Sequence, residues 1–474
     1  MSSPAYGAAM EATLEARPPS LLRTSLHLTR LAAPLSLAKV GYMVMAFVDT
    51  VMAASLGSSE LAALALANAV FFTALVFGLG LTSGVEPLAG DAYAKEGTPG
   101  LMRVIDAGFW FGAVLGLLTA LFSWLVAPEL LRLIGEPPHL VEIGARFLQL
   151  AAWDAVIALA IQALVVQLTI LEKNLMVVVA MALNVGLHLL VNFCLVEGRF
   201  GFPEMGVDGI AIARLSGSVL GFLVLFAAAH HYRGNGQGAL FARLPTWAAV
   251  RAIGVMGSPI GLQALLEVSA FHAVTLWMGL LGEDILSGSQ IALNIASVSF
   301  TVVMGVSSAG ASQVAVAMGR REPTTASIYA RSTILLAWVV AVAFGGAMLF
   351  WDDGIIALYT KDAEVARWAT SFLFCAACFQ FFDMTQCAGF GVLRGLGDTR
   401  IPFIFNIIGY WMVGIPLSYW LVFSRGYDAI ALWWGLTVGL VLISGLVLWR
   451  IRVVLRRPLP DAPAEPTGPL LEAA

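Results

Sequence analysis

Charged residues are scarce in this chain of 474 residues, of which only 12% are Asp, Glu, Lys or Arg. A soluble domain carries roughly 25% charged residues, so this composition excludes an ordinary soluble fold. The mean hydropathy is +0.86, and apolar stretches of about 20 residues recur from Leu31 to the neighbourhood of Arg450. Each stretch must be a helix, because the bilayer core offers no water to an unpaired backbone. The sequence therefore predicts an all-α membrane protein.

Motifs for several other functions are also missing. The four cysteines, three of them in one apolar segment, provide no disulfide framework. No G-x-x-x-x-G-K-[ST] motif occurs, so the chain does not hydrolyse ATP through a P-loop. The basic residues lie in short loops rather than along one stripe, which excludes nucleic acid as an expected partner. The first 30 residues lack the apolar core of a signal peptide, and we expect a retained tail there.

The apolar stretches divide into twelve predicted membrane spans. Lys and Arg concentrate in alternate connecting segments, and this pattern places both termini in the cytoplasm. The predicted spans are residues 31–55, 60–83, 103–126, 144–169, 175–196 and 209–231 in the first half, and 249–281, 285–315, 327–350, 367–393, 401–423 and 429–450 in the second.

The two halves of the chain are related by an internal repeat. Residues 33–57 align without a gap to residues 258–282, at an offset of 225. Further along, the short charged loop 171–174 aligns with 397–400. Six is an even number of spans, so the two halves have the same orientation and form a parallel repeat about the membrane normal.

We expect this repeat to form two six-helix lobes around a central cavity that opens first to one side and then to the other. The predicted divisions are a cytoplasmic N-terminal tail (1–30), a first lobe (31–231), a cytoplasmic linker rich in Gly and basic residues (232–248), a second lobe (249–452) and a cytoplasmic C-terminal tail (453–474).

Four carboxylates lie well inside predicted spans, namely Asp49, Asp154, Glu267 and Asp383. An ionisable group in the bilayer interior costs about 2.5–3.5 kcal/mol, so each is a candidate for function. Few cations accompany them in the sequence. Lys39 lies in the inner part of its span and can snorkel to the surface, and Arg214 lies close to a span end.

Amide side chains share helix faces with these carboxylates, because residues three or four apart lie on one face. Such polar stripes point to a wet cavity or to a neighbouring helix. In the second interpretation the amides form hydrogen bonds between helices, and a buried carboxyl is a neutral structural group. Both interpretations stay open. The amide candidates are Gln263 and Gln380, at helical spacing from Glu267 and Asp383, Gln290 and Asn294 in the eighth span, and Asn184 in the fifth.

A carboxylate in a cavity of low dielectric can bind a proton, a hard cation such as Na⁺ or a cationic organic molecule. Two neighbouring carboxylates hold one net charge more easily than two, because like charges oppose double ionisation. A coupling ion and a cationic cargo would therefore compete for the same negative charges. This competition is the physical basis of antiport.

Four segments together resemble one known family. The family's first helix, with an early Pro followed by Val-Asp, is similar to LAAPLSLAKVGYMVMAFVDTVMA. Its seventh and eighth helices are similar to GSPIGLQALLEVSAF and QIALNIASVSFTVVMGVSSAGASQ. The closest match covers helices ten and eleven, in FQFFDMTQCAGFGVLRGLGDTRIPFIFNIIGYWMVGIPLSY. The family is multidrug and toxin extrusion (MATE), in its NorM-like branch, and the resemblance covers roughly residues 31–450.

The resemblance implies the MATE fold and export of amphipathic organic cations by antiport with Na⁺ or H⁺. Glu267 and Asp383 match the carboxylates that bind the coupling cation in NorM-like members. Asp49 matches an acidic residue that engages cargo or protons, and Gln290 matches a cavity amide. The family often has Tyr four residues before the tenth-helix Asp, whereas Phe379 stands here. Na⁺ and H⁺ therefore both remain open as the coupling ion.

Two alternatives compete with the export of cations. A flippase for lipid-linked precursors has a similar fold but usually needs a cationic cavity for pyrophosphate. A membrane-embedded prenyl or acyl transferase needs Asp-rich or His-Asp constellations near the membrane surface, and the sequence contains none. We therefore expect a transporter rather than an enzyme, without a cofactor, present as a monomer in the inner membrane. Its expected partners are small organic cations and membrane lipids.

Overall fold

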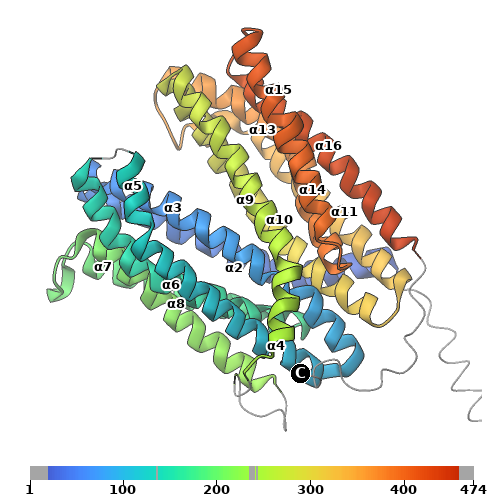
Figure 1. Cartoon of the computed structure of the whole chain (residues 1–474). Coiled ribbons are helices and arrows are strands. Elements are labelled where there is room, and N and C mark those ends of the chain that lie inside the picture. The colour runs from blue at the N-terminus through green and yellow to red at the C-terminus, as the bar shows by residue number, and fades with distance from the viewer. Residues whose placement is uncertain (1–19, 135–136, 234–240, 242–243, 458–474) are drawn as a thin grey trace, which may run out of the picture.

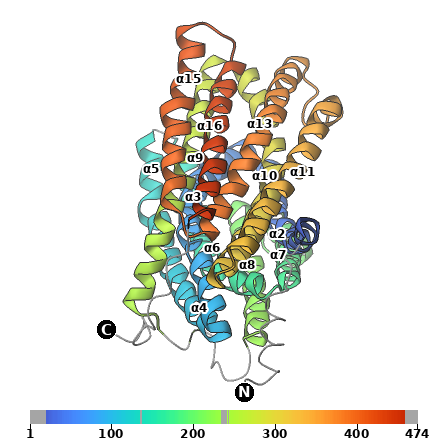
Figure 2. The same cartoon turned by 90° about the vertical axis from the view of Figure 1, so that its right-hand side faces the viewer.

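The computed structural model is helical throughout its regular elements in the part of the chain that it describes (Figures 1 and 2). The described residues are 20–134, 137–233, 241 and 244–457. Eleven helical stretches among them are long and apolar enough to cross a membrane, and the longest, Ser58–Leu133, contains both α3 and α4. The prediction of an all-α, multi-pass membrane protein is confirmed.

The helices follow the chain in two successive groups. The first half contains α2 (Leu21–Leu56), α3 (Ser58–Thr82), α4 (Val85–Leu125), α5 (Ala127–Ile134), α6 (Pro138–Ile170), α7 (Asn174–Leu195), η1 (Arg199–Gly201) and α8 (Gly206–His231). The second half contains α9 (Trp247–Leu281), α10 (Glu283–Gly319), α11 (Pro323–Phe350), α12 (Asp352–Ile356), α13 (Ala363–Gly395), α14 (Arg400–Asn406), η2 (Ile407–Gly414), α15 (Ile415–Tyr419), η3 (Trp420–Ser424) and α16 (Ile430–Leu455).

The elements from α14 to η3 form one continuous helical stretch, Arg400–Ser424, in which η2 and η3 have the wider turns of a π-helix. Pro416 lies inside this stretch and has no N–H to bond to the carbonyl four residues earlier. The missing bond accounts for the wider turn that precedes it.

Most helix ends lie within a few residues of the predicted spans, with two differences. α2 begins at Leu21, ten residues before its predicted span, and Ser20 caps it by accepting a hydrogen bond from the Arg23 amide at 3.4 Å. α4 extends back to Val85, and Gly97 (φ 67°) bends it between a short first segment and the predicted third span. The sequence analysis did not predict α5 and α12, which are too short to cross a membrane.

The predicted division into tails, lobes and linker stays a prediction. Residues 1–19 and 458–474, which make up most of the two predicted tails, lie outside the described residues, as do 234–240 and 242–243 of the predicted linker.

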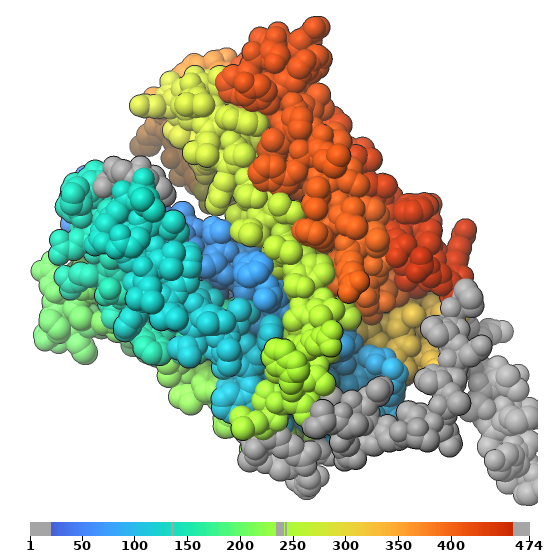
Figure 3. All heavy atoms as spheres, viewed as in Figure 1, coloured from blue at the N-terminus to red at the C-terminus, as the bar shows by residue number. Residues whose placement is uncertain are grey.

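Each half of the chain packs around apolar residues of its own. One buried cluster runs from Ala270 to Ile451 and belongs entirely to the second half, and another runs from Ala53 to Ala211 in the first. In Figure 1, α3, α6, α7 and α8 group on one side, and α9, α13, α15 and α16 group on the other. The two groups diverge from the end where α4 lies, and Figure 3 shows the molecule hollowed between them toward the end where α5 lies.

Two of the crossings between the halves have residues that correspond through the repeat. α3 crosses α9 so closely that a side-chain carbon built at Gly80 would lie 2.4 Å from Gly261 Cα. α2 crosses α10 in the same way, because a carbon built at Gly305 would lie 2.6 Å from Ser36 Cα. The offset of 225 relates Gly80 to Gly305 and Ser36 to Gly261. Small residues permit both close approaches.

Backbone turns repeat at the same offset. Gly57 (φ 151°) and Gly282 (φ 152°) follow α2 and α9 in the same conformation. Glu172 (φ 58°) and Gly397 (φ 76°) occupy the left-handed position after α6 and α13. The sequence alignment paired Leu171 with Gly397 and is therefore wrong by one residue in this loop.

Candidate functional site

Two carboxylates of the second half lie close enough for their charges to interact. Glu267 is in the middle of α9, Asp383 is in the middle of α13, and the charge of Glu267 acts on Asp383. Asp383 is buried and Glu267 is half-buried. Within the described ranges, neither carboxylate forms an ion pair with Lys, Arg or His. The described residues therefore provide this pair with no counter-ion.

Amide side chains surround Glu267. The amides of Gln386 and Asn406 lie within hydrogen-bonding reach of its carboxylate. Gln386 Nε2 donates to Tyr410 Oη, and Asn406 Nδ2 donates to the Gln263 carbonyl, each at 3.3 Å. The amide nitrogens are thus in use, whereas the buried oxygens Gln386 Oε1 and Asn406 Oδ1 have no hydrogen-bond partner among the residues described. Buried acceptors without partners are costly, so these oxygens favour a cation or a proton donor.

Aromatic rings close one side of this cluster. Tyr410 is fully buried, and its ring centroid lies 6.0 Å from that of Phe271. Phe379 packs against Trp433 with 5.5 Å between ring centroids and supplies no oxygen. Tyr410 brings a phenol oxygen to the cluster, where it accepts a hydrogen bond from Gln386 Nε2. The sequence analysis missed Tyr410 and Asn406, because only the packing of Arg400–Ser424 against α9 brings them to Glu267.

The remaining amide candidates of the second half lie on α10 and α13. Gln380 Nε2 donates to Ser299 Oγ at 2.5 Å and ties α13 to α10. Gln290 is half-buried, and Asn294 is exposed and donates to the Gln290 carbonyl at 3.4 Å. In the described part of the chain, neither Gln290 nor Asn294 has a hydrogen bond to the carboxylate pair.

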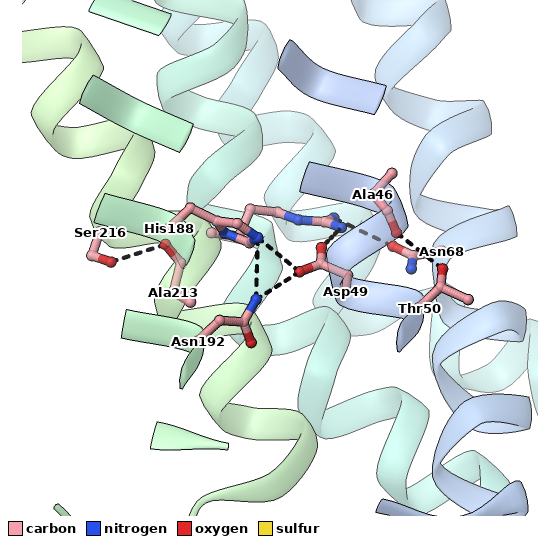
Figure 4. Close-up of polar contacts among 9 residues, drawn as sticks. Ala46, Asp49, Thr50, Asn68, His188, Asn192, Ala213 and Ser216 are labelled. Carbon is pink, nitrogen blue, oxygen red and sulfur yellow. Dashed lines mark hydrogen bonds and ion pairs between the residues drawn. The ribbon is translucent and has the colours of Figure 1, made fainter. Parts of the chain in front are cut away.

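The first half holds a different kind of polar cluster, centred on Asp49 of α2 (Figure 4). The side chain is 1% exposed, and both of its oxygens have partners. Oδ1 accepts a hydrogen bond from Asn192 Nδ2 at 3.0 Å and lies 3.0 Å from His188 Nε2. Oδ2 forms an ion pair with Arg214 Nη2 at 2.6 Å, and Arg214 Nη1 donates to Asn68 Oδ1 at 3.3 Å.

The pairing of Asp49 differs from the sequence expectation that few cations accompany the carboxylates. Arg214 lies near the start of α8, as predicted, but its long side chain reaches Asp49 on α2. Sequence position alone gives no sign of this reach. Asp154 and Asn184 are buried nearby on α6 and α7, and one side-chain oxygen of each lacks a partner among the described residues.

A third charged cluster joins the two halves. Glu86 of α4 forms a mostly buried ion pair with Arg394 Nε of α13 at 2.8 Å. Ser312 Oγ of α10 donates to the same carboxylate at 2.8 Å. The charges of Glu86 and Arg394 also act on Lys39 of α2. This cluster lies at the end where the halves are close together.

The ligand atoms restrict which ions the second-half cluster can take. The described residues contain no group of three or more His, Cys, Asp or Glu that could hold a metal ion. The cluster offers carboxylate, amide and phenol oxygens, which hard cations prefer over soft ones. It therefore suits Na⁺, a proton or an organic cation.

Known proteins match almost the whole chain. The sequence profile of the MatE family matches residues 34–194 and again 259–420, two matches that begin 225 residues apart. The chain is 33% identical over 453 residues to a probable multidrug resistance protein NorM of Burkholderia mallei, covering 92% of this chain and 94% of that protein. It is 30% identical over 448 residues to a probable multidrug resistance protein NorM of Rhizobium meliloti, covering 93% and 95%.

Solved structures share the fold at lower sequence identity. A transporter of the MOP superfamily from Pyrococcus furiosus superposes with a TM-score of 0.83 at 19% identity, covering 92% of this chain and 97% of that one. That protein is described as having a binding pocket of reverse polarity that suggests a different function.

Proposed function

The chain belongs to the MATE family of transporters, and from this premise we propose that it exports amphipathic organic cations in exchange for Na⁺ or H⁺. It is a NorM-like multidrug efflux transporter and not an enzyme. We further propose what kind of cargo the transporter carries. We also propose which ions drive transport and which residues bind cargo and ion.

One observation carries the proposal, namely the unneutralised pair Glu267 and Asp383. Two negative groups lie among oxygen acceptors without an ion-pair partner in the described part of the chain. A bound cation or proton would relieve both the repulsion between the carboxylates and the missing partners of Gln386 and Asn406. We therefore assign the coupling ion to this cluster.

The cluster also explains how two cations can be exchanged. A coupling ion and a cationic cargo need the same negative charge, so the binding of one weakens the binding of the other. A membrane potential of 100 mV supplies about 2.3 kcal/mol for each charge that moves inward. In a one-for-one exchange the outgoing cation carries an equal charge, so the concentration gradient of the coupling ion drives export, and the potential adds this energy only for each coupling charge moved in excess of the cargo charge.

The polar residues of the first half have a secondary place in the proposal. Asp49 would bind a proton or cargo when its pair with Arg214 opens, because the closed pair is already neutral. Asn184 near this cluster, together with Gln263, Gln290, Gln380 and Asn294 of the second half, would contribute polar contacts to cargo.

We propose that the transporter lies in the inner membrane with both termini in the cytoplasm. The distribution of Lys and Arg along the sequence supports this orientation. In this orientation the hollow of Figure 3 opens to the outside, and the Glu86–Arg394 pair closes the cytoplasmic end. Cargo would then be released from this outward-open arrangement. It would be taken up in an inward-open arrangement.

The acidic side chains of the site argue against a flippase for lipid-linked pyrophosphates. Glu267 and Asp383 would repel a pyrophosphate, and the described residues place no cation beside them. The Pyrococcus furiosus protein illustrates that this fold accommodates pockets of different polarity. Acidic polarity therefore favours a cationic cargo here.

Transport by purified protein in liposomes tests the proposal directly. A Na⁺ jump and a pH jump are imposed separately while the movement of ethidium is followed by fluorescence. Glu267→Gln and Asp383→Asn should each abolish ethidium movement driven by either gradient, because each removes one of the two carboxyl groups assigned to the coupling ion. Glu364→Gln is the matched control, since Glu364 lies exposed on the same helix as Asp383 and should behave as the wild type.

Gradient-driven ethidium transport that survives in both site variants would refute the assignment of the coupling ion. Loss of transport in the Glu364 control as well would show that removing any carboxylate disables the protein, and would equally defeat it.

A further inference from the structure

An apolar groove of about 400 Å³ lies between α2, α10 and α11, away from the carboxylate clusters. Its wall combines residues of both halves, because α2 belongs to the first and the other two helices to the second. Leu37 of α2 and Val339 of α11 line it and are 60% and 58% exposed. In a membrane-spanning protein, such a surface faces the lipid.

Among its lining residues, the groove offers no free hydrogen-bond donor to an occupant. Two hydroxyl residues line it, Ser36 and Thr29. Ser36 Oγ already donates to the Val302 carbonyl at 2.7 Å, and Thr29 Oγ1 to the Ser25 carbonyl at 2.8 Å. The remaining lining residues are aliphatic, so the groove favours a hydrocarbon chain.

The α2 wall of the groove is about as long as one leaflet of a bilayer, whereas α10 (Val302 to Val306) and α11 (Leu336 to Val340) each line it over about one turn. Its lining residues on α2 run from Thr29 to Val40, which is about 16 Å at 1.5 Å per residue. Half of the hydrocarbon core of a bilayer is about 15 Å thick. A hydrogen bond of 3.1 Å between Ser25 Oγ and Ser332 Oγ joins α2 to α11 just beyond the Thr29 end.

Two arginines lie at this same end. Arg30 shares a helix face with the lining residue Leu37, and Arg331 shares one with Val339. Both are exposed, and neither has an ion-pair partner among the described residues. Side chains on a helix lean toward its N-terminus, and the Ser25–Ser332 bond places both N-termini at this end. Both guanidinium groups therefore lean toward the leaflet surface.

We propose that this groove binds an anionic phospholipid of the bilayer, with one acyl chain between α2, α10 and α11 and the phosphate against Arg30 and Arg331. The lipid contacts both halves of the transporter at once. It therefore stabilises the arrangement of the halves in which the groove exists, and a rearrangement that closes the groove expels the chain.

Native mass spectrometry of the full-length protein with added dioleoylphosphatidylglycerol or dioleoylphosphatidylcholine tests the site. The variant Arg30→Gln/Arg331→Gln should weaken phosphatidylglycerol binding by roughly thirtyfold and phosphatidylcholine binding clearly less, because the choline cation offsets the charge of the phosphate. Arg251→Gln/Arg400→Gln removes the same charge from two other exposed arginines and should have no such effect. Equal weakening in both double variants would overturn the headgroup assignment.

The acyl chain is tested by filling the groove. Val339→Trp should weaken the binding of both lipids, whereas Val342→Trp, at a position 68% exposed on the same helix but outside the groove, should not. Unchanged lipid binding in Val339→Trp would overturn the proposal. So would displacement of the lipid from the wild type by tetraphenylphosphonium, because the groove would then hold cargo.

Discussion

At the scale of single residues, buried carboxylates in the two halves have opposite surroundings. Asp49 has an arginine, a histidine and an asparagine around it, whereas Glu267 and Asp383 have amides and each other. Removing one partner of a buried ion pair is destabilising, because the other charge is left without a counter-ion. A carboxylate that is not paired is available for exchange.

Asp49→Asn should lower the free energy of unfolding by about 3 kcal/mol, because it leaves the Arg214 guanidinium buried without its counter-ion. Arg214→Met in the same chain should recover most of this loss. Thermal unfolding in detergent measures both effects. If Asp49→Asn unfolds at the wild-type temperature while losing only resistance to cationic drugs, Asp49 acts in charge recognition and not in stability.

Gln386→Met should weaken the binding of the coupling ion by roughly tenfold, because an apolar group of similar size replaces the side-chain amide near Glu267, including its unpartnered oxygen. The concentration of Na⁺, or of H⁺, that gives half-maximal ethidium efflux measures this change. Gln313→Met, at another buried glutamine of the second half, is the control. An equal change in both variants would contradict a role specific to Gln386.

The sequence identified the acidic residues of the site but not their partners. Glu267, Asp383 and Asp49 stand out because a charge in an apolar span is costly wherever it occurs. Arg214 and Tyr410 are ordinary in the sequence, since one lies near a span end and the other is an aromatic residue in an apolar run. Their roles depend on which helices pack together, and one sequence does not contain that information.

At the scale of helices, the crossings between halves depend on the absence of side chains. Gly80→Ala should destabilise the protein by about 1–3 kcal/mol and slow transport, because its new carbon would lie 2.4 Å from Gly261 Cα. Gly186→Ala in α7 meets nothing within 4 Å and should be neutral or slightly stabilising. Apparent melting temperatures and ethidium efflux measure the two effects. Equal behaviour of the two variants would exclude close packing as the cause.

The ion pair between α4 and α13 should hold one end of the molecule closed. Glu86→Gln should increase the population that is open at this end, because it removes a mostly buried charge pair between the halves. Spin labels at the exposed positions Lys95 and Arg400 report the distance across this end. Arg450→Gln breaks another mostly buried ion pair, within the second half, and should leave the distances unchanged. Identical distance distributions for wild type and Glu86→Gln would refute the role in closure.

Helix positions were the most predictable part of the fold. Apolar length determines where a membrane span lies, so most predicted ends agree with the structure to within a few residues. The first segment of α4 was missed because it contains Glu86 and Asp91, and its composition does not differ from that of a loop. Its helical conformation comes from packing against α10, where Gly90 lies against Ala315.

At the scale of the whole molecule, the two halves have similar backbone arrangements but differ in how their buried acidic residues are paired. The first half has neutralised its acidic residue on α2, and the second half has left its acidic pair without a cation among the described residues. Lowering the pH should therefore weaken the binding of tetraphenylphosphonium, because protonated carboxyls carry no charge. Glu267→Gln/Asp383→Asn should flatten this pH dependence, and Glu364→Gln should preserve it. Equilibrium dialysis at a series of pH values provides the measurement.

A pH dependence that persists unchanged in the double variant would place the titrating group elsewhere. Asp154 would then be the next residue to replace, since it is buried and one of its oxygens has no partner in the described part of the chain.

The two glycine crossings have a geometric consequence. Two points of contact, Gly80 against Gly261 and Gly305 against Ser36, define a line through the molecule. Rotation of one half about that line preserves both contacts, whereas any sliding of the halves breaks at least one. Such a rotation must also open other contacts between the halves, among them the Glu86–Arg394 pair and the packing of Gly90 against Ala315, and a single methyl group at either crossing is expected to hinder it.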